Sequence, residues 1–237
     1  MNKTVLITGG GRGIGRACVE IFGERGWTPL IHYNKSERPA EDLADEYGGK
    51  TVQANFSSQA DLDKLMDFIR EREPGTLVNN AGVTPPVDFE ELSREEWQNI
   101  IDVNLTAATF LLRETAKTID SGSIVNVTSI RGLGYCGRSG IADYCASKAG
   151  LESITATLSQ RYAPEIRINA VAPGYTDTDM TAGLDEETRR GVEESTPMDR
   201  FGKPEEIAEA VYFLAGDRAS YVNGETLVVD GGYSVRD

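Results

Sequence analysis

Residues 4–15 read TVLITGGGRGIG, a short apolar run followed directly by a glycine-rich turn. The centre of the run is apolar without alternation, which is typical of a strand buried on both faces of a parallel sheet. Glycines in the turn allow a tight bend and a close approach of the backbone to a pyrophosphate. The helix expected over residues 14–25 would direct its positive N-terminus at the same point. This strand–turn–helix unit predicts a nucleotide-binding site at the start of an α/β fold.

The rest of the chain continues the alternation between short apolar runs and longer amphipathic segments. We expect strands at 30–33, 51–55, 76–79, 123–128, 167–172 and 226–229, and helices over 37–47, 62–70, 97–118 and 143–162, with another helix starting at Pro204. Ser93 and Glu96 form a capping box before the third of these helices. The pattern predicts one doubly wound Rossmann-type α/β domain over residues 1–237, with about seven parallel strands and helices on both faces.

Residues 175–203 form the one region without clear periodicity. The segment is polar and contains Gly183 and Gly191 in its interior. Because such excursions after a strand are often substrate lids in α/β enzymes, we expect a mobile lid here. The alternative is a surface loop that contains a helix or two.

Composition and charge exclude several classes of function. The 237 residues carry a formal net charge of −14, which repels phosphate backbones, so we expect no nucleic-acid partner. His32 is the single histidine, which excludes a multi-histidine metal site, and we expect no metal. Three cysteines without CxxC spacing suit a reducing compartment. No apolar run is long enough to span a membrane and no secretory signal pattern is present, so we expect a cytoplasmic protein.

Further motifs follow in order along the chain. The turn has Gly-x3-Gly-x-Gly spacing, and later elements are Asn79-Asn80-Ala81-Gly82, Asp102-Val103-Asn104, Ser129, Tyr144-x3-Lys148, and Pro173-Gly174 with Thr178 beyond it. Together these motifs resemble the short-chain dehydrogenase/reductase family over almost the whole chain. From about residue 197 to residue 232 the sequence most resembles 3-oxoacyl-[acyl-carrier-protein] reductases and their relatives.

The resemblance implies a catalytic set of Asn104, Ser129, Tyr144 and Lys148. Tyr144 and Lys148 are four residues apart on an expected helix and so share a face. An ammonium group near a phenol favours the phenolate, so we expect a lowered pKa for Tyr144, which suits a general acid/base. The resemblance implies that Ser129 donates to the substrate carbonyl oxygen, Lys148 holds the ribose and Asn104 holds a relay water. Taken alone, Tyr144 and Lys148 would be an exposed surface pair, and Ser129 a turn residue.

The end of the second strand favours NADP(H) over NAD(H) as the cofactor. The strand and the turn after it read His32-Tyr33-Asn34-Lys35, with no acidic residue for a ribose 2′-hydroxyl, and Arg12 in the glycine turn is a second cation. The alternative is that these cations are solvated loop charges. The resemblance implies cofactor contacts from Gly9, Arg12, Gly13, Ile14, Gly15, Asn34, Lys35, Asn55, Phe56, Asn80, Ala81, Gly82, Tyr144, Lys148, Pro173, Gly174, Thr176 and Thr178. Asn55 stands where the family usually has Asp.

These observations predict an NADPH-dependent carbonyl reductase or alcohol dehydrogenase, with 3-oxoacyl thioesters as candidate substrates. The residue 129–144 stretch should line the substrate pocket, and we expect four arginines near its mouth: Arg131, Arg138, Arg189 and Arg190. A net charge of −14 would repel an acidic carrier protein unless these arginines form a patch. The alternatives are a sugar or polyol dehydrogenase of the same family and a non-catalytic dinucleotide-sensing protein. Family analogy implies a homotetramer, with helices 97–118 and 143–162 as candidate interfaces.

Overall fold

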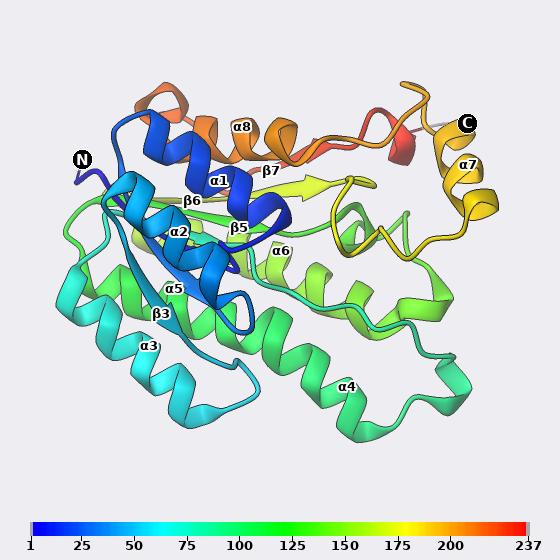
Figure 1. Cartoon of the computed structure of the whole chain (residues 1–237), viewed down its shortest axis with the longest axis horizontal. Coiled ribbons are helices and arrows are strands. Elements are labelled where there is room, and N and C mark those ends of the chain that lie inside the picture. The colour runs from blue at the N-terminus through cyan, green and yellow to red at the C-terminus, as the bar shows by residue number, and fades with distance from the viewer. Residues whose placement is uncertain (1, 236–237) are drawn as a thin grey trace.

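The computed structural model describes residues 2–235 and has one parallel β-sheet as its centre (Figure 1). Its seven strands lie in the order β3-β2-β1-β4-β5-β6-β7, and every neighbouring pair is parallel. The strands are β1 (Thr4–Thr8), β2 (Thr28–Tyr33), β3 (Lys50–Gln53), β4 (Thr76–Asn79), β5 (Gly122–Val127), β6 (Ile166–Pro173) and β7 (Thr226–Val229). This is the doubly wound Rossmann-type sheet that the sequence predicts.

Helices cover both faces of the sheet (Figure 1). They are α1 (Gly13–Glu24), α2 (Glu37–Tyr47), α3 (Gln59–Arg72), α4 (Arg94–Ile101), α5 (Ala107–Thr118), α6 (Ala142–Tyr162), α7 (Glu186–Ser195) and α8 (Pro204–Ala215). Within residues 2–235, no helix is both long and apolar enough to cross a bilayer.

Alternation along the strands divides the core into two layers. Val5 and Val125 face the layer that contains α1, α2 and α8, whereas their neighbours Leu6 and Ile124 face α3, α5 and α6. Successive residues of a strand point to opposite faces, so a strand covered on both faces must be apolar throughout. This requirement explains the continuous apolar runs in the sequence.

Two details of the helices differ from the sequence expectation. The capping box at Ser93 is present, but the helix expected over 97–118 is divided by a π-helical turn at Asp102–Thr106. Segment 175–203 contains the regular helix α7, which lies at the end of the molecule toward which β6 points (Figure 1). A π-helical turn cannot be recognised from apolar spacing alone, because one inserted residue barely changes the periodicity.

The strand order reverses between β1 and β4, and this reversal positions the site. The chain leaves β1 toward α1 on one side, and β4 continues the sheet on the other side. Open α/β sheets bind ligands at this switch point, beyond the carboxyl ends of the strands. The motifs singled out in the sequence follow the ends of β1, β4, β5 and β6.

Candidate active site

The glycine turn after β1 forms a cradle at the N-terminus of α1. Gly9 and Gly13 have φ values of 68° and 51°, which favour glycine. A Cβ atom on Gly15 would lie 2.1 Å from the Gly9 carbonyl oxygen, so helix and turn meet at a distance that only glycine permits. No side chain caps α1, and its first turn has no acidic residue, so its leading N–H groups are available to an anion. The cradle therefore fits a dinucleotide pyrophosphate.

Buried polar side chains hold this turn in place. His32 accepts a hydrogen bond from Gly9 N at Nδ1 (3.1 Å), and its Nε2 lies 3.0 Å from the Ala54 carbonyl oxygen. Because a carbonyl only accepts, the proton is on Nε2 and the ring is neutral. Burial lowers the pKa of His32 to about 4, although the bond to Ala54 acts in the opposite direction. The sequence left the partner of His32 open, and the structure assigns it to the glycine turn.

The Asn80-Ala81-Gly82 segment is joined to the same turn. The Thr8 hydroxyl accepts hydrogen bonds from Asn80 N (2.9 Å) and Ala81 N (3.0 Å), and Asn80 Nδ2 donates to the Thr8 carbonyl (2.8 Å). Gly82 faces the catalytic candidates: a Cβ atom there would lie 3.3 Å from Asn104 Oδ1 and 3.5 Å from Lys148 Nζ. The ends of β1 and β4 thus form one continuous wall of the site.

Asn104 lies in the π-helical turn and clasps the neighbouring backbone. Its Oδ1 accepts from Val83 N (2.9 Å), and its Nδ2 donates to the Val83 carbonyl (2.9 Å) and to Ser147 Oγ (3.2 Å). Its amide is therefore engaged with backbone and with α6. π-Helical turns occur often at functional sites, where one extra residue redirects a side chain. Here the turn directs Asn104 between the segment after β4 and α6.

Tyr144, in the first turn of α6, lies beside Ser129, which follows the end of β5. Burial raises the pKa of the Tyr144 phenol, while hydrogen bonding to Ser129 and the charge of Arg131 act in the opposite direction. The sequence expectation of a lowered pKa is therefore wrong. Desolvation of the phenolate outweighs the nearby cations, and Lys148 is not among the groups that shift this pKa.

Lys148 is buried one helical turn after Tyr144. Its Nζ donates to the Val127 carbonyl (2.8 Å) and lies 5.7 Å from the centre of the Tyr144 ring. Burial lowers the pKa of Lys148 to about 8, and the carboxylate of Glu152 partly opposes that shift. Lys148 is thus a partly desolvated amine between β5, Gly82 and Tyr144, within the group that the sequence selected.

The residues proposed for cofactor selection lie near the ends of β2 and β3. Asn34 and Lys35 are exposed at the turn after β2. Arg12 is also exposed, and its guanidinium lies 3.6 Å from Asp179, a surface pair that contributes little. The Asn55 Oδ1 accepts from Ser57 N (3.1 Å), so one lone pair of that oxygen is already used.

Phe56 and the segment after β6 complete the expected cofactor contacts. Phe56 stacks on His32, with ring centres 4.3 Å apart. Gly174 N donates to the Val229 carbonyl (2.9 Å), and Thr176 Oγ1 donates to the Gly174 carbonyl (3.2 Å), so Pro173-Gly174 leads into an ordered turn. A Cβ atom on Gly13 would lie 3.3 Å from the Thr178 methyl group. The turn after β6 therefore lies against the glycine cradle, and Ile14 is half-buried in the same region.

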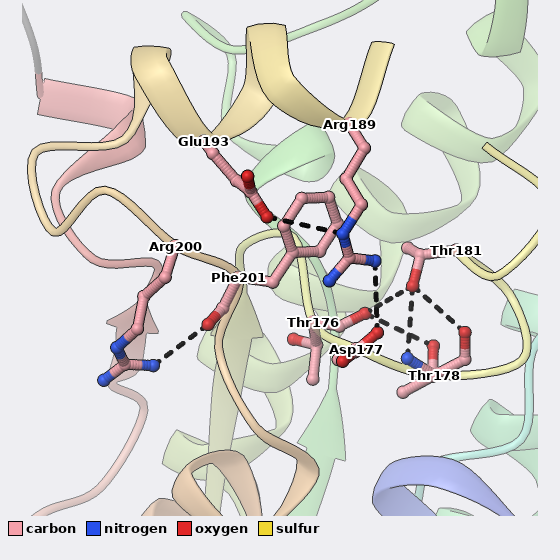
Figure 2. Close-up of polar contacts among 8 residues, drawn as sticks. All are labelled: Thr176, Asp177, Thr178, Thr181, Arg189, Glu193, Arg200 and Phe201. Atoms are coloured by element: carbon pink, nitrogen blue, oxygen red, sulfur yellow. Dashed lines mark hydrogen bonds and ion pairs between the residues drawn. The ribbon is translucent and has the colours of Figure 1, made fainter. Parts of the chain in front are cut away.

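A polar network inside segment 175–203 joins α7 to the turn after β6 (Figure 2). The Arg189 guanidinium of α7 lies over the Phe201 ring, 4.3 Å from its centre, and pairs with Asp177 and Glu193, each at 3.3 Å. Thr181 Oγ1 accepts from Thr178 N (3.1 Å) and lies 2.7 Å from the Thr176 carbonyl oxygen. Helix α7 is thus tied to the turn after β6.

A cavity of about 330 Å³ opens between α7 and the loop that follows Ser129. Its lining residues are Arg131, Gly137, Arg138, Tyr175, Thr188, Gly191, Val192 and Tyr233. Arg131, Gly137 and Arg138 of the 129–144 stretch line this cavity, and that it is the substrate pocket stays a prediction. Arg189 and Arg190 lie between the lining residues Thr188 and Gly191 and are paired with acids. Arg189 forms ion pairs with Asp177 and Glu193, and the exposed Arg190 pairs with Glu194 at 3.8 Å. The two arginines have different partners because successive residues of a helix point in different directions.

Sequence reasoning missed four residues of this region. Thr8 and His32 hold the glycine turn, and Tyr175 and Tyr233 line the cavity. The position of Thr8 directly before the glycines was a usable signal. The two tyrosines come from distant parts of the chain, and no local pattern connects them.

Comparisons with known proteins agree with this geometry. The family model described as enoyl-(acyl carrier protein) reductase matches residues 9–234. The chain is 40% identical to a 3-oxoacyl-[acyl-carrier-protein] reductase of Aquifex aeolicus, covering 97% of this chain and 96% of that protein. It is 38% identical to the protein of the same name from Escherichia coli, covering 97% and 96%. A crystal structure provisionally named a gluconate dehydrogenase, from Agrobacterium tumefaciens, superposes with a TM-score of 0.92 at 32% identity, covering 99% and 96%.

Proposed function

The chain belongs to the short-chain dehydrogenase/reductase family, and on that premise we propose that it is an NADPH-dependent carbonyl reductase with Tyr144 as its general acid/base. Membership makes the protein an oxidoreductase that acts on CH–OH and C=O groups. The observation that carries the proposal is that Tyr144 lies beside Ser129 and Lys148, and that Lys148 faces Gly82 in the segment hydrogen-bonded to the glycine turn.

The glycine cradle would hold the pyrophosphate of a nicotinamide dinucleotide at the leading N–H groups of α1. Lys35 and Arg12 would hold a 2′-phosphate, because both are exposed cations near the turn after β2 and that turn contains no acidic residue before Glu37. Lys148 would hold the ribose hydroxyls. When bound, this cofactor supplies or accepts the hydride.

The protein's own groups manage the proton and the carbonyl oxygen. Ser129 donates a hydrogen bond to the carbonyl oxygen and polarises it. Tyr144 gives its proton to that oxygen as negative charge develops, and takes the proton back when an alcohol is oxidised. A phenol with a raised pKa stays protonated at neutral pH, which suits the reducing direction. The pKa of Lys148 is about 8, which is close to neutral pH, so this amine would share in returning the proton to Tyr144.

The relatives named as 3-oxoacyl-[acyl-carrier-protein] reductases make 3-oxoacyl thioesters the first substrates to test. A sugar or polyol dehydrogenase is the second candidate, favoured by the structural likeness to the protein named a gluconate dehydrogenase. A protein that only senses dinucleotides is the alternative of another class. The complete set of Asn104, Ser129, Tyr144 and Lys148 counts against it. The lid role of segment 175–203 and the homotetramer remain predictions.

The decisive experiment compares the wild type with Tyr144→Phe. NADPH oxidation is followed with acetoacetyl thioester and with a panel of neutral ketones, and NADPH binding is measured by fluorescence titration. We expect the variant to lose about 10²- to 10⁴-fold in kcat with nearly unchanged NADPH affinity, because only the acid/base group is removed. Retained turnover in Tyr144→Phe would contradict the assignment. NADPH binding without turnover of any carbonyl compound would favour the sensing protein.

A further inference from the structure

The cavity beside Ser129 is lined by hydrogen-bond donors and cations. Arg131 follows Ser129 by two residues, and Arg131 N donates to Ser129 Oγ (3.1 Å). The Arg131 side chain is half-buried and lies 5.4 Å from the ring centres of both Tyr175 and Tyr233. Arg138 is exposed and lines the same cavity. The two guanidinium groups therefore converge on one small space.

Hydrogen bonds orient this group of side chains. Tyr175 Oη accepts from Arg131 Nη2 (2.9 Å) and from Arg138 Nη1 (3.3 Å). A phenol that accepts twice keeps its own proton free to donate into the cavity. Arg131 Nη1 donates to the Cys136 carbonyl (3.0 Å), which fixes the direction of the guanidinium plane.

The two arginines of the cavity have hydrogen-bond partners but no acidic partner among the described residues. Among residues 2–235, no carboxylate lies within ion-pair distance of Arg131 or Arg138. The neighbouring arginines of α7, in contrast, are all paired with acids. What distinguishes Arg131 and Arg138 is that both line the same cavity and both donate to the same tyrosine hydroxyl. The overall field of a chain with a net charge of −14 repels anions, so an anionic substrate needs a local cationic receptor.

We propose that Arg131 and Arg138, with the Tyr175 hydroxyl, form a receptor for a carboxylate carried by the substrate. The inference rests on the proposed function and specifies it: the enzyme reduces oxo acids, or oxidises hydroxy acids, in preference to their neutral esters. The planar guanidinium and the phenol present donors that match the two oxygens of a carboxylate. Gly191 and Val192 of α7 also line the cavity.

The receptor lies beside the catalytic groups. Arg131, which lines the cavity, follows Ser129 by two residues, and its backbone N donates to Ser129 Oγ (3.1 Å). A carboxylate held at Arg131 therefore places the rest of a small molecule near Ser129 and Tyr144. Arg131 and Arg138 act on binding and orientation, and the proton transfer stays with Tyr144.

The test uses a series of straight-chain oxo acids with the carbonyl at successive positions, each paired with its methyl ester. Initial rates of NADPH oxidation are measured for the wild type, Arg138→Gln and the control Arg190→Gln, whose arginine is an exposed residue of α7 outside the cavity. Arg138 is chosen because it is exposed and its loss should leave the fold intact.

We expect at least one acid to exceed its ester by about tenfold in kcat/KM, since hydrogen bonds to charged groups are the strong ones. Arg138→Gln should lower kcat/KM for that acid by about ten- to a hundredfold and for the ester by less than about twofold, mostly through KM. Arg190→Gln should leave both values unchanged. Esters that match or exceed every acid, or an equal loss for acid and ester in Arg138→Gln, would overturn the receptor.

Failure of the proposed function gives a different result. If neither acids nor esters are reduced in a Tyr144-dependent manner, the reductase proposal fails. The receptor proposal is then tested separately, by calorimetric titration of the protein with the same acids and with inorganic phosphate. Binding of an acid that is lost in Arg138→Gln supports the receptor. Binding of phosphate alone, or of no anion, overturns the assignment to a carboxylate.

Discussion

Acidification should destabilise this protein through one side chain, His32. The buried imidazole is neutral, accepts from Gly9 N and donates to the Ala54 carbonyl. Its pKa is about 4 in the folded chain, against an ordinary value of 6.5. The folded state therefore binds fewer protons than the unfolded state between these two values. Stability from His32 is complete above pH 6.5 and is lost as pH falls toward 4.

The magnitude follows from the two pKa values. The full difference of about 2.5 units corresponds to roughly 3.4 kcal/mol. Between about pH 7.5 and about pH 5 the unfolded chain gains most of its proton while the folded chain gains little, which removes about 2 kcal/mol. The lower pH of about 5 lies above the usual pKa of carboxyl groups, so His32 dominates the change in unfolding free energy over this pH interval. Protonation of His32 in the folded protein removes the acceptor for Gly9 N–H, so cofactor affinity should fall only as the pH approaches about 4.

Urea unfolding at both pH values measures the change, with His32→Leu as the comparison. The variant should be less stable than the wild type, because Gly9 N and the Ala54 carbonyl lose a partner. Its free energy of unfolding should nevertheless lack the fall of about 2 kcal/mol between the two pH values. Since the sequence has a single histidine, proton NMR observes its titration without assignment. An imidazole that titrates near its ordinary value in the folded protein, or an equal acid sensitivity in His32→Leu, would refute the reasoning.

Three further substitutions test the site. Gly15→Ala would place a methyl group 2.1 Å from a carbonyl oxygen. It should destabilise the fold by about 1–3 kcal/mol in thermal melting and weaken NADPH binding at least about tenfold in titration. Gly134→Ala, which has open space around it, should change neither quantity. Asn104→Ala leaves two backbone groups without partners and should cost about 1–3 kcal/mol in chemical denaturation; an unchanged midpoint would contradict the clasp. Lys35→Asp should shift the NADPH/NADH ratio of kcat/KM toward NADH by about tenfold or more, while Lys64→Asp on α3 should not; equal ratios in both variants would remove Lys35 from cofactor selection.

Local patterns predicted much of the site. The capping box at Ser93 lies where the sequence places it, because its hydrogen bonds join residues three apart. Tyr144 and Lys148 share a helix face for the same local reason. The sign of the pKa shift at Tyr144 was wrong, because burial is a property of the assembled fold and outweighs the effect of the expected neighbour.

The sequence by itself determined the alternation of strands and helices, the glycine cradle and the spacing of the catalytic pair, because each depends on residues that are close along the chain. Only the tertiary structure decided what faces the reacting groups. Arg131 meets Tyr233 across 102 residues, and Gly9 meets His32 across 23. The packing of α7 decided which arginines remain in the cavity and which are neutralised by acids. Such contacts arise from the docking of elements against one another, and no local pattern encodes the direction in which a distant side chain points.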